Sequence, residues 1–303
     1  MGRIRVFLDT SVVRSYVHGD QTAQPLASLS PHDQGLSVAL ANSAVAELTI
    51  QLVEGRLTWD DWGRRIPDID RVVDQESPIG PNEAEWQSAG NRWAVPTLPV
   101  SRADHMRAIW SLLRGARSTA DLTTGTELVG ASGFRWPVAV TPEMSRASID
   151  DDRKPWVDLI ADLQARVTEM RKVNPIGSHP TQERLAQDYL NTRRAERPED
   201  PTWSMRHDGH TRALARFVHL ALIPRAPYNA AAEDRQGDAH DLVMLMALAV
   251  PALVCTIDGR LLRHMELTKS VQSGQVLKPA DLLAGAETGD LIQRFPAELR
   301  TLM

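Results

Sequence analysis

The sequence is poor in cysteine and in long hydrophobic runs. The first shortage speaks against a disulfide-bonded protein, and the second against a membrane-spanning one. It has one cysteine, Cys255, among 303 residues. A single cysteine cannot form a disulfide within the chain, which is typical of a reducing compartment, so we expect a cytoplasmic protein. No stretch reaches the roughly 18–20 consecutive apolar residues that cross a bilayer, so we expect no membrane partner.

The chain also lacks a surplus of positive charge. Its formal net charge is −5, and almost all of its 34 basic residues are arginine rather than lysine. A basic surplus is the usual sign of a nucleic-acid-binding protein, and the chain as a whole does not show it. With 42% hydrophobic and 24% charged residues, the composition is that of one elaborated globular domain or two.

Several catalytic motifs are missing. There is no glycine-rich phosphate-binding loop, which speaks against a nucleotide-driven enzyme, and no G-x-S-x-G of a serine hydrolase. No cysteine–histidine spacing indicates a zinc site, because His207 and His210 have no further ligand nearby. An aspartyl phosphatase would need a second aspartate two residues after Asp9, and Ser11 stands there.

Hydrophobic patterning predicts strands and helices that alternate at both ends of the chain. The expected strands are 3–8, 37–41, 252–257 and 276–277. The expected helices are 11–17, 43–54 with Ser43 as its cap, 239–249, 259–266 and 279–284. This alternation is typical of an α/β fold with a parallel sheet covered on both faces.

All eight tryptophans lie between Trp59 and Trp203, which predicts a distinct middle segment with its own core. Helices are expected there at 59–73, 82–93, 101–115, 155–173, 181–197 and 208–222, with a short strand near 138–140. We therefore expect one discontinuous sheet-based domain, residues 1–57 and 211–303, and a mostly helical insertion, residues 58–210.

Four carboxylates stand where packing alone would not favour them. Asp9 and Asp258 each end a predicted strand, Glu47 lies among apolar helix residues, and Asp241 lies near a helix start. Carboxyl ends of neighbouring parallel strands share one edge, so all four converge if the strands before Asp9 and Asp258 are neighbours. Clustered like charges repel, and bound Mg²⁺ or Mn²⁺, which prefers oxygen ligands, would offset the repulsion.

The aspartates also have purely structural explanations. Asp241 and Asp238 could be helix-capping acids, and Asp9 could cap the helix that follows it. Asp258, before Gly259, could be a turn acid. Taken singly, each of these readings is the simpler one, and the functional interpretation depends on the four acids occurring together.

Three stretches in this order, VFLDTSVV, SAVAELT and DLVMLMALAVPALVCTIDGRLL, resemble the PIN domain, a family of metal-dependent nucleases. The matched stretches lie within residues 1–57 and about 235–285, where VLKPADLL resembles the family's closing strand and helix. The resemblance implies a three-layer α/β/α sandwich with a central parallel sheet. It also implies hydrolysis of phosphodiester bonds, most often in RNA, by an endoribonuclease.

By motif position, the resemblance places the family's acids at Asp9, Glu47, Asp241 and Asp258, with Mg²⁺ or Mn²⁺ as the cofactor. Asp238 is an alternative third metal ligand, and the spacing to Asp258 favours Asp241. Ser11 and Thr256 match the hydroxyl residues that flank such sites. The implied partner is RNA, with DNA as the alternative; a protein inhibitor such as an antitoxin, and a homo-oligomer, are compatible with the family.

An acidic protein needs local basic groups to hold an anionic substrate. Arg14, Arg260 and Arg263 flank the predicted strand ends and are the candidates for substrate binding. Arg193 and Arg194, in the middle segment, are expected to lie on a solvated helix face. The alternative function is a catalytically inactive PIN-like binding or scaffold protein, whose helical insertion binds a partner.

Overall fold

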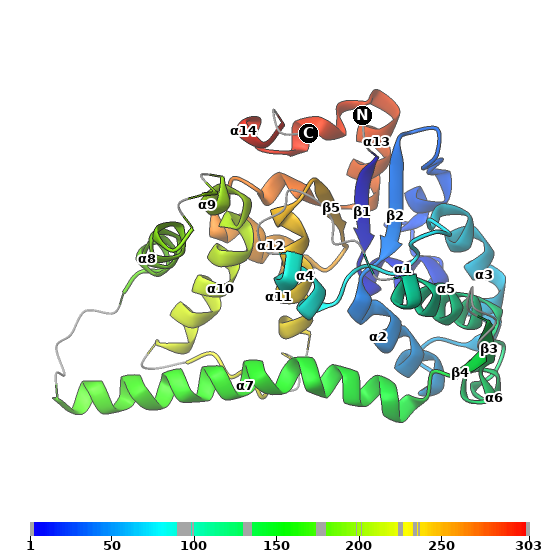
Figure 1. Ribbon diagram of the computed structural model, residues 1–303, viewed down its shortest axis with the longest axis horizontal. Helices are drawn as coiled ribbons and strands as arrows, with labels where there is room; N and C mark the ends of the chain where they lie inside the picture. The colour runs from blue at the N-terminus through cyan, green and yellow to red at the C-terminus, as the bar shows by residue number, and fades with distance from the viewer. Residues whose placement is uncertain are drawn as a thin grey trace.

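The computed structural model describes residues 3–89, 98, 100–129, 135–173, 180–197, 199–200, 202–223, 227–232, 235 and 237–300 (Figure 1). At its centre is a parallel sheet of four strands in the order β2-β1-β5-β6. The strands are β1 (Ile4–Leu8), β2 (Leu36–Leu40), β5 (Ala252–Cys255) and β6 (Val276–Leu277). The predicted α/β fold with a central parallel sheet is confirmed.

The sheet is buried on both faces. Every residue of β2 and β5 is buried, as is the end of β1. A strand covered on both sides reads as a continuous apolar run, which is why these strands were recognisable in the sequence. In the register of β1 with β5, Leu8 lies opposite Cys255, so the residues after both strands emerge at the same edge.

Helices and short 3₁₀ turns follow the strands. They are α1 (Thr10–His18), η1 (Gln24–Ser28), α2 (Asn42–Val53), α11 (Asp238–Leu245), η3 (Met246–Ala249), α12 (Gly259–Thr268), η4 (Ser273–Gln275), α13 (Pro279–Thr288), η5 (Asp290–Arg294) and α14 (Ala297–Arg300). The prediction that Ser43 caps α2 was wrong. The cap position is Ala41, which has no polar side chain, and Ser43 lies inside the helix.

The middle of the chain is mostly helical, as expected. Its elements are α3 (Trp59–Val72), α4 (Glu83–Ala89), α5 (Val100–Gly115), α6 (Thr119–Thr124), β3 (Thr126–Val129), β4 (Arg135–Val138), α7 (Pro142–Val173), α8 (Gln182–Ala195), α9 (Trp203–Arg206) and α10 (Asp208–Ala221). The strand expected near 138–140 shares only Val138 with β4, which lies earlier in the chain and pairs antiparallel with β3. Of the helix expected at 82–93, residues 90–93 lie outside the described residues.

The longest helix, α7, runs along one side of the molecule and contacts α2, α10 and α11 (Figure 1). It begins at Pro142, so the start predicted at residue 155 was wrong. Proline favours the first turn of a helix, but Pro155 lies in the interior of α7.

Among the described helices, including this one, none combines the length and the apolar character needed to cross a bilayer.

The middle segment shares its core with the two ends of the chain. Trp62, Trp110 and Trp156 belong to the same connected hydrophobic cluster as Val6 of β1 and Leu253 of β5. The expectation of a separate core was therefore wrong, because the buried side chains of the middle segment and of the sheet-based part form one continuous cluster. The boundary at 210/211 also falls inside α10, and the division into 1–57 with 211–303 and 58–210 stays a prediction.

Candidate functional site

The four predicted acids line one pocket at the carboxyl ends of β1 and β5. Asp9 directly follows β1, and Asp258 is the third residue after β5. Glu47 lies on α2, and Asp241 lies on α11. The pocket has a volume of about 190 Å³. Its other lining residues are Thr10, Ser11, Arg14, Ser43, Gly237, His240, Met244 and Arg260. We call it the acid pocket.

Hydroxyl groups hold the Asp9 carboxylate. Its Oδ2 accepts hydrogen bonds from the Ser11 hydroxyl and, at 2.7 Å, from the Thr256 hydroxyl. The hydroxyl of Ser11 in turn accepts the backbone N–H of Ile257 at 3.2 Å, and that of Thr256 accepts the N–H of Asp258 at 3.0 Å. Asp9 occupies the N-cap position of α1, but its side chain accepts no backbone N–H of that helix. Ser11 and Thr256 thus tie the ends of β1 and β5 together around it.

Asp258 caps α12 while lining the acid pocket. Its Oδ1 accepts the backbone N–H of Arg260 at 2.6 Å and that of Leu261 at 3.3 Å. The structural explanation offered for this acid therefore holds in the form of an N-cap. The cap fixes the carboxylate at the junction of β5 and α12, which is also the rim of the pocket.

Glu47 has a partner that the sequence did not single out. Its Oε1 lies 2.8 Å from Nδ1 of His240, whose side chain is 5% exposed. The hydrogen bond joins α2 to α11 inside the acid pocket. In the sequence, His240 is marked only by its position directly before Asp241 at the start of a helix. That position does not indicate a contact with Glu47.

Asp238 and Asp241 occupy different places. The hydroxyl of Tyr228 donates to Asp238 Oδ2 at 2.8 Å, and Asp238 lines a larger neighbouring pocket. Asp241 lines both that pocket and the acid pocket. Of the two alternatives for the third metal ligand, Asp241 is therefore the one that lies with Asp9, Glu47 and Asp258.

The acids of the pocket repel one another. The pKa of Asp9 is raised, mainly by burial and then by the Glu47 and Asp258 carboxylates, although the hydrogen bonds from Ser11 and Thr256 oppose the rise. The pKa of Asp241 is raised well above its ordinary value, by burial first and then by the surrounding carboxylates, that of Asp9 foremost. A cation in this pocket would relieve both the repulsion and the loss of solvation.

The acid pocket offers carboxylate oxygens, the donor type that a hard cation prefers. Within the described residues, however, no three His, Cys, Asp or Glu side chains are arranged so that they could hold a metal ion directly. Mg²⁺ typically keeps several waters, so the four acids suit an ion that they contact partly through water.

The predicted arginines lie at the rims. Arg14, on α1, and Arg260, on α12, are exposed and line the acid pocket. Arg263 lines the larger pocket, as does Arg260. On α8, Arg194 is exposed and Arg193 pairs with Glu196 at 2.9 Å, as expected of a solvated helix face.

The site is therefore assembled from both ends of the chain, with acids at two strand ends and on two helices. Its interpretation depends on these residues alone. No protein-family model, curated protein or solved structure matches this chain.

Proposed function

We propose that this protein is a nuclease that requires Mg²⁺ or Mn²⁺ and hydrolyses phosphodiester bonds, with RNA as the favoured substrate. The observation that carries the proposal is the meeting of Asp9, Glu47, Asp241 and Asp258 in one pocket at the carboxyl edge of a parallel sheet. Four carboxylates would repel a polyanion, so the pocket makes chemical sense for phosphates only with a cation. The resemblance to the PIN domain supports the same interpretation.

Each residue then has a defined part. Asp9, Glu47, Asp241 and Asp258 would hold the cation, directly or through water. The cation would supply a Lewis acid for the phosphate and lower the pKa of water. Ser11 and Thr256 orient Asp9, and the start of α12 orients Asp258. A reducing, cytoplasmic location belongs to the proposal, because a single cysteine, Cys255, cannot form a disulfide within the chain.

The decisive experiment incubates the purified protein with labelled RNA and DNA pools, in Mn²⁺ and in EDTA. We expect RNA cleavage in Mn²⁺, none in EDTA, and none by Asp9→Asn. Asp33→Asn, which changes an exposed acid outside the pocket, is the matched control and should cleave normally. Cleavage that persists in EDTA, or in Asp9→Asn, would refute the mechanism.

One observation favours the alternative, a protein that binds without cutting. Among the described residues, no set of three potential ligands is arranged to hold a metal ion. A binding protein of this kind would cleave neither nucleic acid with any divalent cation. Its unfolding temperature would also be unchanged by Mn²⁺, whereas a metal-dependent enzyme gains stability when the ion binds the folded state.

A further inference from the structure

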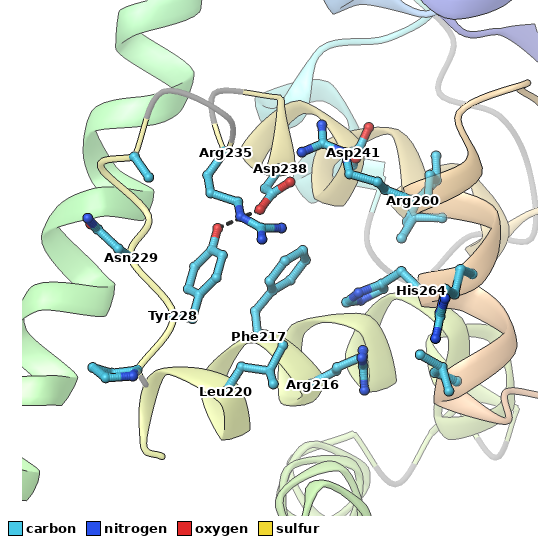
Figure 2. Close-up of a pocket in the computed structure, with 16 residues that line it drawn as sticks. Arg216, Phe217, Leu220, Tyr228, Asn229, Arg235, Asp238, Asp241, Arg260 and His264 are labelled. Carbon is cyan, nitrogen blue, oxygen red and sulfur yellow. Dashed lines mark hydrogen bonds between the residues drawn. The ribbon is translucent and has the colours of Figure 1, made fainter. Parts of the chain in front are cut away.

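A second pocket adjoins the acid pocket and shares Asp241 and Arg260 with it. It has a volume of about 530 Å³ and lies among α10, α11, α12, residues 227–232 and Arg235 (Figure 2). Small-molecule sites typically measure roughly 300–1,000 Å³, so this pocket is large enough for an organic ligand. We call it the arginine pocket.

Positive charge dominates its rim. Four arginines line it, namely Arg216, Arg235, Arg260 and Arg263. The two carboxylates are Asp238, which accepts the Tyr228 hydroxyl, and Asp241, at the border with the acid pocket. The balance of charge around the cavity favours an anion.

Two of these arginines, Arg216 and Arg263, line the pocket from α10 and α12, which pack against each other. The pKa of Arg216 is lowered, mainly by burial and further by the positive charge of Arg263. Nε of Arg216 is buried and has no hydrogen-bond partner among the described residues, and its NH1 group lies 3.4 Å from the Gln182 side-chain oxygen. Holding two like charges together with a buried, unused donor costs free energy, and a bound anion would offset that cost.

The floor of the arginine pocket is aromatic and uncharged. Phe217 stacks on the His264 ring at 4.4 Å between centroids, and Tyr228 lies 5.2 Å from Phe217. Burial lowers the pKa of His264 to about 4, so its imidazole is neutral at pH 7. Figure 2 shows the three rings side by side, with Arg216 below and Asp241 and Arg260 above. Phe217 and Tyr228 are buried against their neighbours, and the parts that line the pocket form an apolar floor, which suits the face of a nucleic-acid base.

We infer that the arginine pocket binds one nucleotide, with its base against Phe217 and Tyr228 and its phosphate between Arg216 and Arg263. Guanidinium groups are the usual partners of phosphate, because their planar donors match its oxygens. Arg260, which lines both pockets, then contacts the next phosphate of a single strand as it enters the acid pocket. Binding of a nucleotide in this pocket does not depend on nuclease activity. The placement of that nucleotide beside the cleaved bond does rest on the proposed function.

The test measures binding in EDTA by calorimetry, with the full-length protein and four probes: nucleoside monophosphates, adenosine, inorganic phosphate and a short oligoribonucleotide. We expect the monophosphates to bind more tightly than either adenosine or phosphate. Arg216→Ala and Arg263→Ala should each weaken monophosphate binding roughly tenfold, because each removes charged hydrogen bonds. Arg260→Ala should weaken oligonucleotide binding more than monophosphate binding.

Arg194→Ala, on the exposed face of α8, is the control and should bind all four probes like the wild type. Arg263 is itself exposed, so Arg263→Ala should fold even if Arg216→Ala does not. Inorganic phosphate binding as tightly as the monophosphates would overturn the inference, as would no monophosphate binding at all. Cleavage without monophosphate binding would refute this pocket alone, and monophosphate binding without cleavage would refute the nuclease alone.

Discussion

Nδ1 of His240 lies 2.8 Å from Oε1 of Glu47, so one acid of the pocket has a buried hydrogen-bond partner on a different helix. This contact links α2, which follows the edge strand β2, to α11, which precedes β5. Groups that hydrogen-bond to metal-binding carboxylates orient them, and they matter nearly as much as the ligands. His240 therefore belongs to the site through Glu47.

Replacing His240 should weaken metal binding. His240→Ala removes the group that orients Glu47, and we expect the apparent affinity for Mn²⁺ to fall roughly 10–100-fold. Electron paramagnetic resonance of free Mn²⁺ during a titration measures this directly. His32→Ala, at an exposed position outside the pocket, should leave the affinity unchanged. An unchanged affinity in His240→Ala would show that the hydrogen bond is only structural.

Asp9→Asn should fold at least as well as the wild type when no metal is present. Asparagine keeps an oxygen that can accept the Ser11 and Thr256 hydroxyls, and it removes one charge from a repelling group. The free energy of unfolding should therefore hold or rise by about 1 kcal/mol. Urea unfolding in EDTA checks this, and a clear loss of stability would mean that Asp9 is a structural acid.

The double variant Arg260→Ala with Arg263→Ala should bind RNA more weakly and with less dependence on salt. Each phosphate contact on a single strand contributes roughly 0.7 to the slope of log affinity against log salt, so losing two should reduce it by about 1.4. Affinity measured across a salt series in EDTA gives this slope, with Arg194→Ala as the control. Equal slopes for the double variant and the wild type would place the RNA elsewhere.

His264 should make the protein less stable in mild acid. Its Nε2 lies 3.2 Å from the Ala213 carbonyl oxygen, and its pKa is lowered to about 4 by burial and by Arg216. In the unfolded chain, the His264 imidazole takes up a proton near pH 6.5. Its contribution to the free energy of unfolding is therefore fully present above that pH. It is lost as the pH falls toward 4, by up to about 3 kcal/mol.

His264→Gln should flatten this pH dependence, because glutamine can donate to the same carbonyl and does not titrate. Unfolding free energies measured between pH 4 and 7 test the prediction. His32→Gln, at an exposed position, should keep the wild-type profile. The prediction fails if His264→Gln loses as much stability in acid as the wild type does.

Two acids pair with Arg212, and they should differ sharply in importance. Asp208 is buried and also accepts the Ser270 hydroxyl at 2.6 Å and the Val271 N–H at 3.1 Å. Glu183, with a side chain that is 63% exposed, contacts the same arginine at 2.6 Å. Asp208→Ala should cost about 3–5 kcal/mol in chemical unfolding, and Glu183→Ala less than about 1 kcal/mol. Similar losses of stability in the two variants would contradict the view that the buried pair of Asp208 with Arg212 matters more than the exposed pair of Glu183 with Arg212.

The sheet and the acid pocket were predictable because their signals are local. Buried parallel strands appear as apolar runs, and Asp9 and Asp258 stand at the ends of two of them. The α7 start was not predictable, because Pro155 is a local helix-start signal that tertiary packing overrides. Pro137 similarly argues against β4 in sequence, although a two-stranded sheet tolerates it.

The arginine pocket and the role of His240 depend on packing between distant segments. Arg216 on α10 and Arg263 on α12 meet only because those helices pack together. In the sequence, nothing singles out Arg216, and Arg263 is indicated only by its position shortly after Asp258. Likewise, no spacing rule connects His240 to Glu47, which are 193 residues apart. Contacts of this kind carry no periodic signal in a single sequence.

The hydrogen bond from Thr256 to Asp9 spans 247 residues, and this separation matters while the protein is being made. Strand β1 lies between β2 and β5, so one of its edges stays open until β5 leaves the ribosome. At roughly 5–20 residues per second, this interval lasts on the order of 10–50 s. An unpaired strand edge is a site at which chains can aggregate, and β1 of a nascent chain carries this hazard throughout the interval. The acids of the site come together only after residue 258 has been synthesised.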